Sequence, residues 1–261
     1  KIDPASMAEC ALDEAMRNSV AAGGDPDYTV ILDNYCWGNT RDPQCLGELV
    51  RATEALCDLA MTYRTPFVSG KDSLHNEFNT GEKTIRIPGC ILVSAMSVIP
   101  DVTRTMTSDF KRAGSKIVLI GMTKDELGGS VYYKTKGELG KNAPRVLKDS
   151  ALATLNGVHR AIQAGCVLAA HDLSEGGVSA AATEMSIGGR LGADVQLDAM
   201  NVEGSLNATK RMFSESQSRF LLEIPPDRLD DLKANLHEVP FAVIGEVRSD
   251  EQLSFTNNNE A

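Results

Sequence analysis

The sequence has 261 residues, with 36 acidic against 26 basic side chains and a formal net charge of −10. A chain of this length can bury a core without disulfide or metal cross-links, and its 42% hydrophobic and 24% charged residues are ordinary for a globular protein. The acidic balance argues against nonspecific binding to nucleic acid or to an anionic membrane, because both favour a basic surface.

Targeting and redox signals point to the cytoplasm. The sequence contains no apolar run of the roughly 18 residues that a membrane helix needs. No apolar stretch that could form a signal peptide follows the first residues. The six cysteines form no C-x-x-C pair, which predicts reduced, packed thiols. Because position 1 is not Met, we expect the sequence to be a piece of a longer chain.

The first hundred residues are predicted to alternate between helices and strands. Apolar residues at helical spacing predict helices over 7–20 and 46–63. Short apolar, β-branched runs predict strands over 28–32, 66–69 and 90–99. The segment 34–43, rich in Asn, Gly and Pro, is predicted to be a loop.

The segment 100–108 has neither a helical nor a strand period, and we interpret it as a domain boundary. It separates a predicted domain 1–105 from a predicted domain 106–261. In the second domain, strands are predicted over 116–120, 166–170, 220–224 and 241–247, and helices over 144–164, 176–187 and 227–236. This alternation predicts an α/β or α+β fold.

Familiar catalytic and nucleotide-binding motifs are absent from the sequence. The phosphate loop G-x-x-x-x-G-K-[ST] fails, because Asp72 follows Gly70 and Lys71. No G-x-G-x-x-G follows a predicted strand, and neither G-x-S-x-G nor H-E-x-x-H occurs.

Polar residues gather instead where the predicted strands end. Asp33 follows the strand 28–32, where a carboxylate can hold Mg²⁺ or nucleotide hydroxyls, or can simply form a turn. After the strand 66–69, Gly70 allows close approach to a phosphate, Lys71 supplies a charge and Ser73 a hydroxyl. An ordinary turn is the alternative interpretation of this second cluster.

Two further clusters suit a magnesium nucleotide. Asp172 and Ser174 precede a predicted helix whose N-terminus favours anions, although Ser174 could equally be a helix cap. Glu14 and Asn18, four residues apart on one helix face, are oxygen donors of the kind Mg²⁺ prefers, or else part of a solvated face. The stretches 127–130 and 214–217 are interpreted as loops. The residues alone indicate an unusual nucleotide site and no particular reaction.

These motifs, in this order, resemble the second half of the phosphoribosylformylglycinamidine synthase family, the ATP-dependent amidotransferases of purine biosynthesis. The resemblance is carried by LDEAMRN at 12–18, LDNYCWGN at 32–39, TPFVSGKDSLHNE at 65–77, ELGGS at 126–130, HDLSEGGV at 171–178, and FSES with RF at 213–220. It covers nearly the whole chain. The wider superfamily includes aminoimidazole ribonucleotide synthase, selenophosphate synthetase, thiamine monophosphate kinase and a hydrogenase maturation factor.

The resemblance implies a fold and a reaction. The fold would be aminoimidazole ribonucleotide synthase-like, with an N-terminal α/β domain that is incomplete at its start and contributes to a central β-barrel, followed by a C-terminal α/β domain. In the reaction, ATP would activate the amide oxygen of formylglycinamide ribonucleotide. Ammonia, delivered from glutamine by a glutaminase domain or subunit, would then displace phosphate.

The same resemblance implies partners for this chain. The N-terminal half of the same enzyme would complete the catalytic site, so the 261 residues alone are expected to be inactive. The barrel edge exposed by the incomplete start would favour self-association.

Residue roles in the catalytic site follow by matching positions. The resemblance assigns ATP contacts to Asp33, Gly70 and Lys71, and a substrate contact to Ser73. Lys71 departs from the shorter relatives, which place a Mg²⁺-ligating Asn there. A protonated Lys cannot ligate Mg²⁺, but it can neutralise a phosphate.

A second, auxiliary nucleotide site is also implied. Glu14, Asn18 and Asp172 resemble its Mg²⁺ ligands, and Ser174 resembles an ATP contact there. The family's catalytic histidines belong to the first half, so no catalytic residue is assigned in this chain. The alternative function is therefore a non-catalytic half that holds an auxiliary Mg²⁺-ADP or Mg²⁺-ATP for structural reasons.

Overall fold

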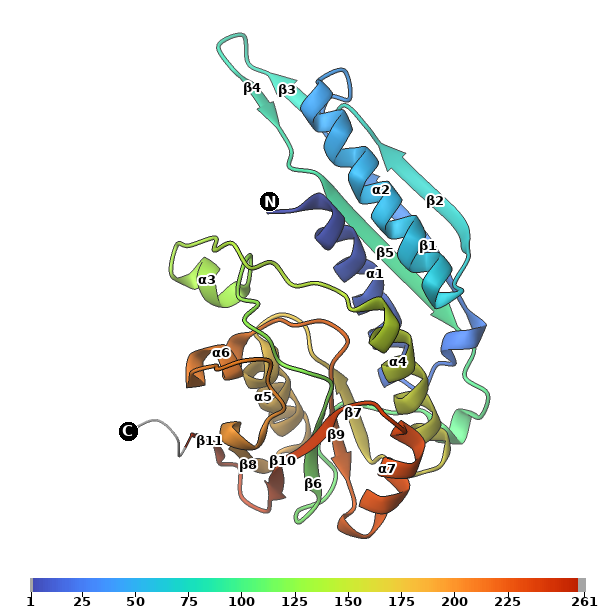
Figure 1. Cartoon of the computed structure of the whole chain (residues 1–261), viewed down its shortest axis with the longest axis vertical. Coiled ribbons are helices and arrows are strands. Elements are labelled where there is room, and N and C mark those ends of the chain that lie inside the picture. Colours follow the sequence, from blue (N-terminus) through green and yellow to red (C-terminus); the bar gives the residue numbers. More distant parts are fainter. Residues whose placement is uncertain (1, 258–261) are drawn as a thin grey trace.

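A computed structural model describes residues 2–257 of the chain. It contains a three-stranded sheet in the order β2–β1–β5, a six-stranded sheet in the order β11–β8–β10–β6–β9–β7, and a small hairpin, β3–β4. Figure 1 shows the smaller sheet with its two helices above the larger sheet. The predicted α/β class is confirmed.

The smaller sheet carries two helices on one of its faces. Its strands are β1 (Thr29–Cys36), β2 (Phe67–Ser73) and β5 (Cys90–Ser97), and its helices are α1 (Pro4–Ala21) and α2 (Pro43–Tyr63). Ile31 and Tyr35 are buried beneath the helices, because alternate residues of a strand point to one face. On the opposite face Leu92 is 60% exposed. The helices predicted over 7–20 and 46–63 are confirmed.

Helix starts in this layer follow from capping residues. The carboxylate of Asp3 accepts a hydrogen bond from the backbone N–H of Ser6, and Pro4 occupies the first turn of α1. The carboxylate of Asp42 likewise accepts a hydrogen bond from the N–H of Gln44, and Pro43 is the first residue of α2. An acidic cap followed by proline is a strong helix start, because proline has no N–H to leave unpaired.

Two predicted strand ends in this layer are wrong. β1 continues to Cys36 and β2 continues to Ser73, so these polar residues lie within strands and do not form loops. The predicted loop 34–43 therefore begins too early. The cause is a parallel ladder in which Asp33 pairs with Gly70 and Cys36 pairs with Ser73. Backbone pairing between strands extends them through residues whose side chains favour turns.

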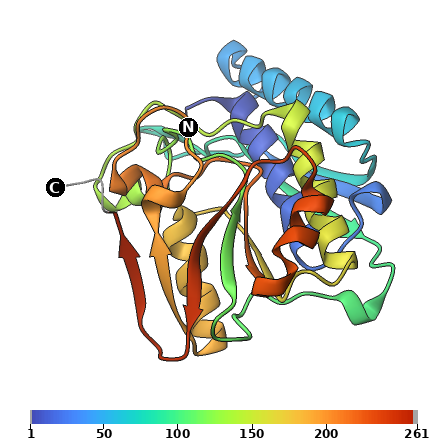
Figure 2. The ribbon, with the colours of Figure 1, turned by 60° about the horizontal axis from the view of Figure 1, so that its bottom comes forward.

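The larger sheet is mostly antiparallel. Its strands are β6 (Lys116–Ile120), β7 (Ala169–Asp172), β8 (Gly192–Gln196), β9 (Phe220–Ile224), β10 (Phe241–Arg248) and β11 (Leu253–Thr256). The pairing of β11 with β8 is parallel, and the other four pairings are antiparallel. Figure 2 shows these strands from a second side.

Helices cover this sheet on both faces. Val118 and Ile120 pack in one cluster with α4 (Lys148–Gln163), α7 (Leu229–Leu236) and α1. Ile117 and Leu119 pack in a second cluster with α5 (Gly177–Gly189). The run 116–120 is apolar at successive positions because both of its faces are buried. Helix α1 contacts α2 and β5 as well as α4 and β7, so it lies between the two sheets.

Some of the remaining elements have other bounds than the sequence predicts, and others were not predicted. The strand predicted over 166–170 lies later, so that His171 and Asp172 belong to β7, and the helix predicted over 144–164 begins at Lys148. Elements not predicted are α3 (Val131–Thr135), α6 (Ala208–Phe213), β3 (Glu77–Asn79), β4 (Thr84–Arg86), β8, β11 and the short 3₁₀ helices η1 (Pro26–Tyr28), η2 (Val102–Arg104), η3 (Leu197–Ala199) and η4 (Pro226–Arg228). Most are too short to show a period.

The domain boundary predicted near 100–108 stays a prediction, although this stretch contains only η2 between the last strand of one sheet and the first of the other. None of the helices within residues 2–257 combines the length and the apolar character that a membrane span requires.

Candidate functional site

A cavity of about 500 Å³ opens between helix α1 and two loops of the larger layer. Glu14 of α1 lines it, together with Gly128 and Gly129. Ser174 and Glu215 line it from two further segments. The fold therefore brings four motifs to one place that are far apart in the sequence: LDEAMRN, ELGGS, HDLSEGG and FSES.

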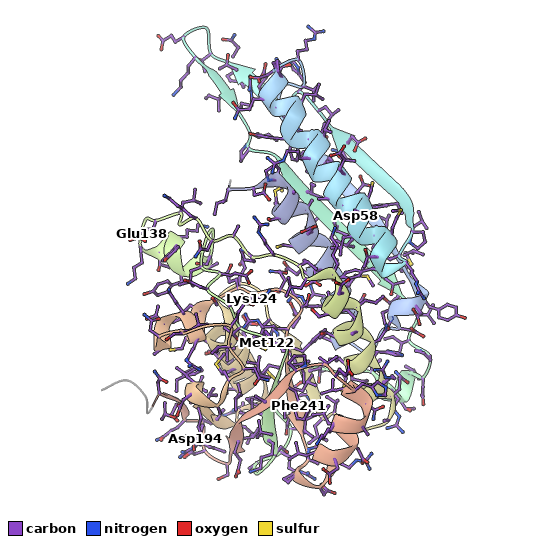
Figure 3. All side chains as sticks on the ribbon, in the orientation of Figure 1. Asp58, Met122, Lys124, Glu138, Asp194 and Phe241 are labelled. Carbon is purple, nitrogen blue, oxygen red and sulfur yellow. The ribbon has the colours of Figure 1, made fainter. Side chains whose placement is uncertain are left out.

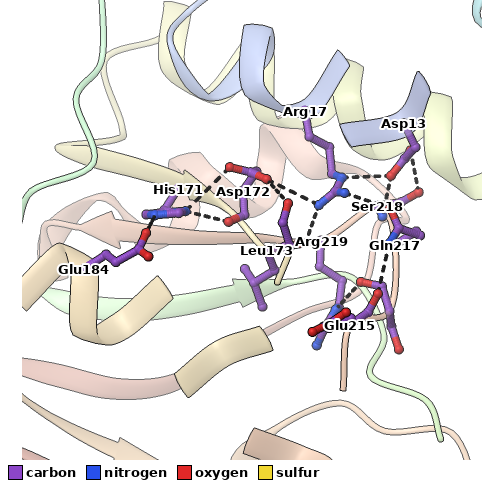
Figure 4. A network of polar contacts seen from close by, with 12 residues as sticks. Asp13, Arg17, His171, Asp172, Leu173, Glu184, Glu215, Gln217, Ser218 and Arg219 are labelled. Carbon is purple, nitrogen blue, oxygen red and sulfur yellow. Dashed lines mark hydrogen bonds and ion pairs between the residues drawn. The ribbon is translucent and has the colours of Figure 1, made fainter. Parts of the chain in front are cut away.

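The guanidinium of Arg17 lies at the centre of the polar contacts behind this cavity (Figure 4). Its side chain is fully buried. It donates to the carboxylate of Asp13 at 2.8 Å, to the backbone carbonyl of Leu173, and to the side-chain oxygen of Gln217 at 2.8 Å. One of its nitrogens also lies 3.7 Å from the carboxylate of Asp172. Arg17 thus ties α1 to the segments that carry Ser174 and Glu215.

Asp13 completes this network from the same face of α1. Its carboxylate accepts hydrogen bonds from the hydroxyl of Tyr63 at 2.5 Å, and from the N–H and hydroxyl of Ser218 at 2.8 and 2.9 Å. Burial raises the pKa of the Tyr63 phenol, and the negative charge of Asp13 raises it further. The phenol therefore remains a donor at neutral pH, and the buried carboxylate has partners on every side.

The three predicted Mg²⁺ ligands lie close together. The side-chain amide nitrogen of Asn18 donates to one carboxylate oxygen of Asp172 at 2.8 Å, and the hydroxyl of Ser174 donates to the other oxygen. Burial raises the pKa of Glu14, and the charges of Asp172 and Glu175 also raise it, while Arg17 lowers it. Carboxylates that lie close enough to raise the pKa of Glu14 also favour a nearby cation.

This donor set fits Mg²⁺ bound as a nucleotide complex. Mg²⁺ is usually held by one or two carboxylates together with phosphate oxygens and water. Glu14 and Asp172 supply two carboxylates, and Asn18 would supply an amide oxygen if a metal replaced the hydrogen bond between its amide nitrogen and Asp172. Within residues 2–257, no three His, Cys, Asp or Glu side chains form a group that could hold a metal alone. A metal here would therefore need oxygens from its ligand to complete the coordination.

The predicted anion site at the start of α5 is partly filled by the protein itself. The N–H of Gly176, the residue that precedes α5, donates to a carboxylate oxygen of Glu215 at 2.9 Å. The same oxygen accepts the N–H of Val131, the first residue of α3, also at 2.9 Å. Glu215 thus joins two helix starts, and a phosphate here would meet fewer unpaired N–H groups than the sequence suggested.

Replacing Glu215 with alanine is expected to reduce stability, because two backbone N–H groups would lose their shared acceptor. The loss should be about 1–3 kcal/mol for each N–H left without a partner. Glu215→Gln retains the accepting oxygen and removes the charge of a partly buried carboxyl group whose pKa is raised by burial, so its loss of stability should be much smaller. Urea unfolding of both variants measures the difference. Equal losses would contradict the acceptor role.

The segment that carries Glu215 is fixed by a second buried arginine. Arg219 is fully buried and donates to the backbone carbonyls of Ser214 and Ser216 at 2.6 and 2.8 Å. Burial lowers the pKa of Arg219 to about 9, and Arg17 contributes to this shift. The hydroxyl of Ser216 accepts the N–H of Lys124 at 3.0 Å, and Lys124 is labelled in Figure 3 on the loop after β6. The predicted loop 214–217 is confirmed as a loop, with ordered contacts.

The other predicted nucleotide contacts lie at a different place, the edge of the smaller sheet. Asp33 lines a cavity of about 300 Å³ together with Asp72 and Tyr35. Burial raises the pKa of Asp33, and the charge of Asp72 also raises it. A Cβ atom on Gly70 would lie 2.2 Å from a carboxylate oxygen of Asp33, so a glycine is needed for this carboxylate to cross the strand.

Lys71 and Ser73 lie on the opposite face of the same strand. Successive residues of a strand point to opposite faces, and the register pairs Lys71 with Asn34 and Ser73 with Cys36 on β1. The Lys71 ammonium donates to the Ser73 hydroxyl. The predicted ATP contacts Asp33 and Gly70 thus face the helices, whereas Lys71 and Ser73 face the side that no helix of residues 2–257 covers. One ligand could reach both sets only around the edge strand β2.

His171 has a structural position. Its two ring nitrogens lie 2.8 Å from a carboxylate oxygen of Glu184 and 2.5 Å from the backbone carbonyl of Asp172. These contacts hold the imidazole ring between β7 and α5. Sequence reasoning left Asp13, Arg17 and Glu215 without a role, although all three lie in the motifs quoted above. The signal in the sequence was a pair of opposite charges, Asp13 and Arg17, each next to an apolar residue, Leu12 or Met16. The structure shows that both apolar residues are buried.

Comparisons with known proteins give a family and a fold. Residues 112–257 match the family model described as AIR synthase related protein, C-terminal domain. The chain is 33% identical over 259 residues to the phosphoribosylformylglycinamidine synthase subunit PurL of Thermococcus sibiricus, covering 99% of this chain and 35% of that protein. It therefore spans about a third of the length of this curated relative.

Solved structures share the fold at lower identity. PurL of Thermotoga maritima complexed with FGAR matches with a TM-score of 0.77 at 19% identity, over 99% of this chain and 42% of that one. HypE of E. coli, a hydrogenase maturation protein, matches with a TM-score of 0.70 at 16% identity, over 97% of this chain and 77% of that one. Other T. maritima PurL structures are complexed with ATP and with ADP.

Proposed function

Because the chain belongs to the AIR synthase related family, we propose that it forms the second half of a phosphoribosylformylglycinamidine synthase. The observation that carries this proposal is the 33% identity to a PurL subunit along 99% of the chain. Identity that continues through both sheets, and is not confined to one motif, favours a shared activity over a shared fold. The quoted motifs line the cavity beside α1 and the edge of the smaller sheet.

The proposed reaction converts formylglycinamide ribonucleotide to formylglycinamidine ribonucleotide. ATP activates the amide oxygen, and ammonia from glutamine displaces phosphate. This half would contribute Asp33, Gly70 and Lys71 to the ATP and Ser73 to the substrate. Lys71 would neutralise phosphate, since its ammonium is exposed and cannot ligate Mg²⁺.

The other parts of the enzyme would complete this site. An N-terminal half and a glutaminase subunit or domain would supply the catalytic residues and the ammonia. The chain alone would then be inactive. Its smaller sheet would pair through the edge strand β2 with the other half, or with a second copy in its absence. A biosynthetic role of this kind would place the protein in the cytoplasm.

The second candidate function is a structural one, and the cavity beside α1 favours it. Here Glu14, Asn18 and Asp172 would hold Mg²⁺, and Ser174 would contact the nucleotide, so that an ADP or ATP joins α1 to the larger layer without reacting. The metal would supply charge neutralisation for the phosphates among these carboxylates. Both functions can belong to one enzyme, one at each cavity.

Calorimetric titration of the chain with Mg²⁺-ADP tests the cavity beside α1. We expect Asp172→Asn to weaken binding by about tenfold or more, equivalent to at least ~1.4 kcal/mol, because one of two carboxylate ligands loses its charge. Asp227→Asn, at an exposed position in η4, is the matched control and should bind as the original chain does. Absence of binding, or equal binding by both variants, would contradict a nucleotide site at this cavity.

A further inference from the structure

Two cysteines lie directly opposite each other at one end of the smaller sheet. Cys36 and Cys90 are the last pair in the antiparallel ladder between β1 and β5. Directly opposed residues have Cβ atoms about 4.5–5.5 Å apart. A disulfide needs about 3.5–4.5 Å. Both thiols are free, Cys36 is partly buried and Cys90 is exposed, so a small adjustment would bring accessible sulfurs into bonding distance.

The backbone beyond this pair is held in place by Trp37. A Cβ atom on Gly89 would lie 2.6 Å from the Trp37 ring, so the residues flanking the cysteines are packed on each other. The indole N–H of Trp37 donates to the carbonyl of Cys45 at 3.0 Å, and its backbone N–H donates to the carbonyl of Ser73 at 2.8 Å. The two strand ends therefore stay together, which keeps the thiols opposed.

The other four cysteines are poorly placed to form a disulfide with Cys36 or Cys90. Burial raises the pKa of the Cys10 and Cys45 thiols, which keeps them protonated and unreactive. Cys166 is buried between the sheet and its helices. Cys57 is exposed, but it lies on α2 beside Asp33, at the face of the sheet opposite to Cys36.

We propose that Cys36 and Cys90 are a redox-active dithiol that small-molecule disulfides convert into a cross-strand disulfide. The exposed Cys90 thiolate attacks the incoming disulfide, forms a mixed disulfide and releases one thiol. The Cys36 thiolate then attacks the Cys90 sulfur of that mixed disulfide and releases the second thiol. The protein loses two electrons and two protons, and both are recovered in the two released thiols.

The proposed disulfide would lie beside Ser73, for which a substrate contact is proposed. In the register across the three strands, Cys36 pairs with Cys90 on one side and with Ser73 on the other. The disulfide would therefore fix the end of the sheet where Ser73 lies. The dithiol itself does not depend on the proposed function, because it rests on register, exposure and packing.

The test uses oxidised glutathione as the probe. The folded chain is incubated with it, remaining thiols are blocked by alkylation, and the digest is analysed by mass spectrometry. We expect a cross-link between the peptides containing Cys36 and Cys90, reversed by dithiothreitol, and a glutathione adduct on Cys57. Glutathione adducts on both Cys36 and Cys90 without a cross-link would overturn the proposal, as would two unmodified thiols.

Single variants separate the steps. Cys36→Ser removes the resolving thiol, so the glutathione adduct on Cys90 should accumulate. Cys57→Ser is the matched control, and the cross-link should form in it at the original rate. A cross-link that involves Cys57 as often as Cys36 would show unselective oxidation and would also overturn the proposal.

Discussion

Arg17→Met is expected to lower the free energy of unfolding by about 3–5 kcal/mol, the usual cost of removing one partner from a buried ion pair. Methionine retains an unbranched apolar chain of similar volume but lacks the guanidinium group. It leaves the Asp13 carboxylate buried without its cationic partner, and it leaves the carbonyl of Leu173 and the side-chain oxygen of Gln217 without a donor. Urea unfolding followed by circular dichroism measures the loss.

Arg51→Met is the matched control for this experiment. Arg51 also pairs with an aspartate, Asp3, but its side chain is 59% exposed, whereas that of Arg17 is fully buried. Exposed pairs contribute about 0–1 kcal/mol, because water screens and solvates both charges. A loss for Arg17→Met no larger than that for Arg51→Met would contradict the central place of Arg17 in the fold.

Gly177→Ala is expected to cost about 2–5 kcal/mol, from two separate causes. The residue has φ +61°, where an L side chain costs roughly 1–2 kcal/mol. An alanine Cβ would also lie 2.5 Å from the carbonyl oxygen of Ser214 and 2.8 Å from that of Met212. Overpacking of this kind costs about 1–3 kcal/mol, since backbone atoms must move. Thermal or urea unfolding gives the total.

Gly204→Ala separates these two causes. Gly204 has φ +73°, but no atom lies within 4 Å of the Cβ position. Its substitution should therefore carry the strain alone, about 1–2 kcal/mol. If both variants lose the same stability, the close approach of the HDLSEGG segment to the loop at Ser214 makes no difference, and the packing account is wrong.

Many helices and strands could be predicted because their apolar residues recur at regular spacing or form continuous runs. Residues 116–120 and 220–224 are continuous apolar runs, apart from Lys116 and Glu223, and both strands occur as expected. Glu223 is fully buried, yet it accepts the N–H groups of Lys111 and Arg112 at 2.7 and 2.9 Å. The extension of β2 over Gly70 and Lys71 could not be predicted, since it depends on pairing with β1 and not on local propensity.

The candidate site was predictable only in part. Glu14 and Asn18 share a helix face by their spacing, and the structure places Asp172, which the resemblance had grouped with them, beside Asn18. The roles of Asp13 and Arg17 were missed, because charged helix residues are usually exposed. Their burial comes from partners 156 to 205 residues away in the sequence, which no local pattern records.

That separation has a consequence for how the chain is made. Helix α1 is synthesised before most partners of its buried charges, because Leu173, Gln217 and Ser218 emerge 156 to 205 residues later. Until then Asp13 and Arg17 have only each other, Tyr63 and water as partners, and burying them between the sheets would be costly. Helix α1 should therefore dock late during translation, after most of the larger sheet has left the ribosome. In the nascent chain, the smaller sheet and α2 would therefore fold before α1 packs against them.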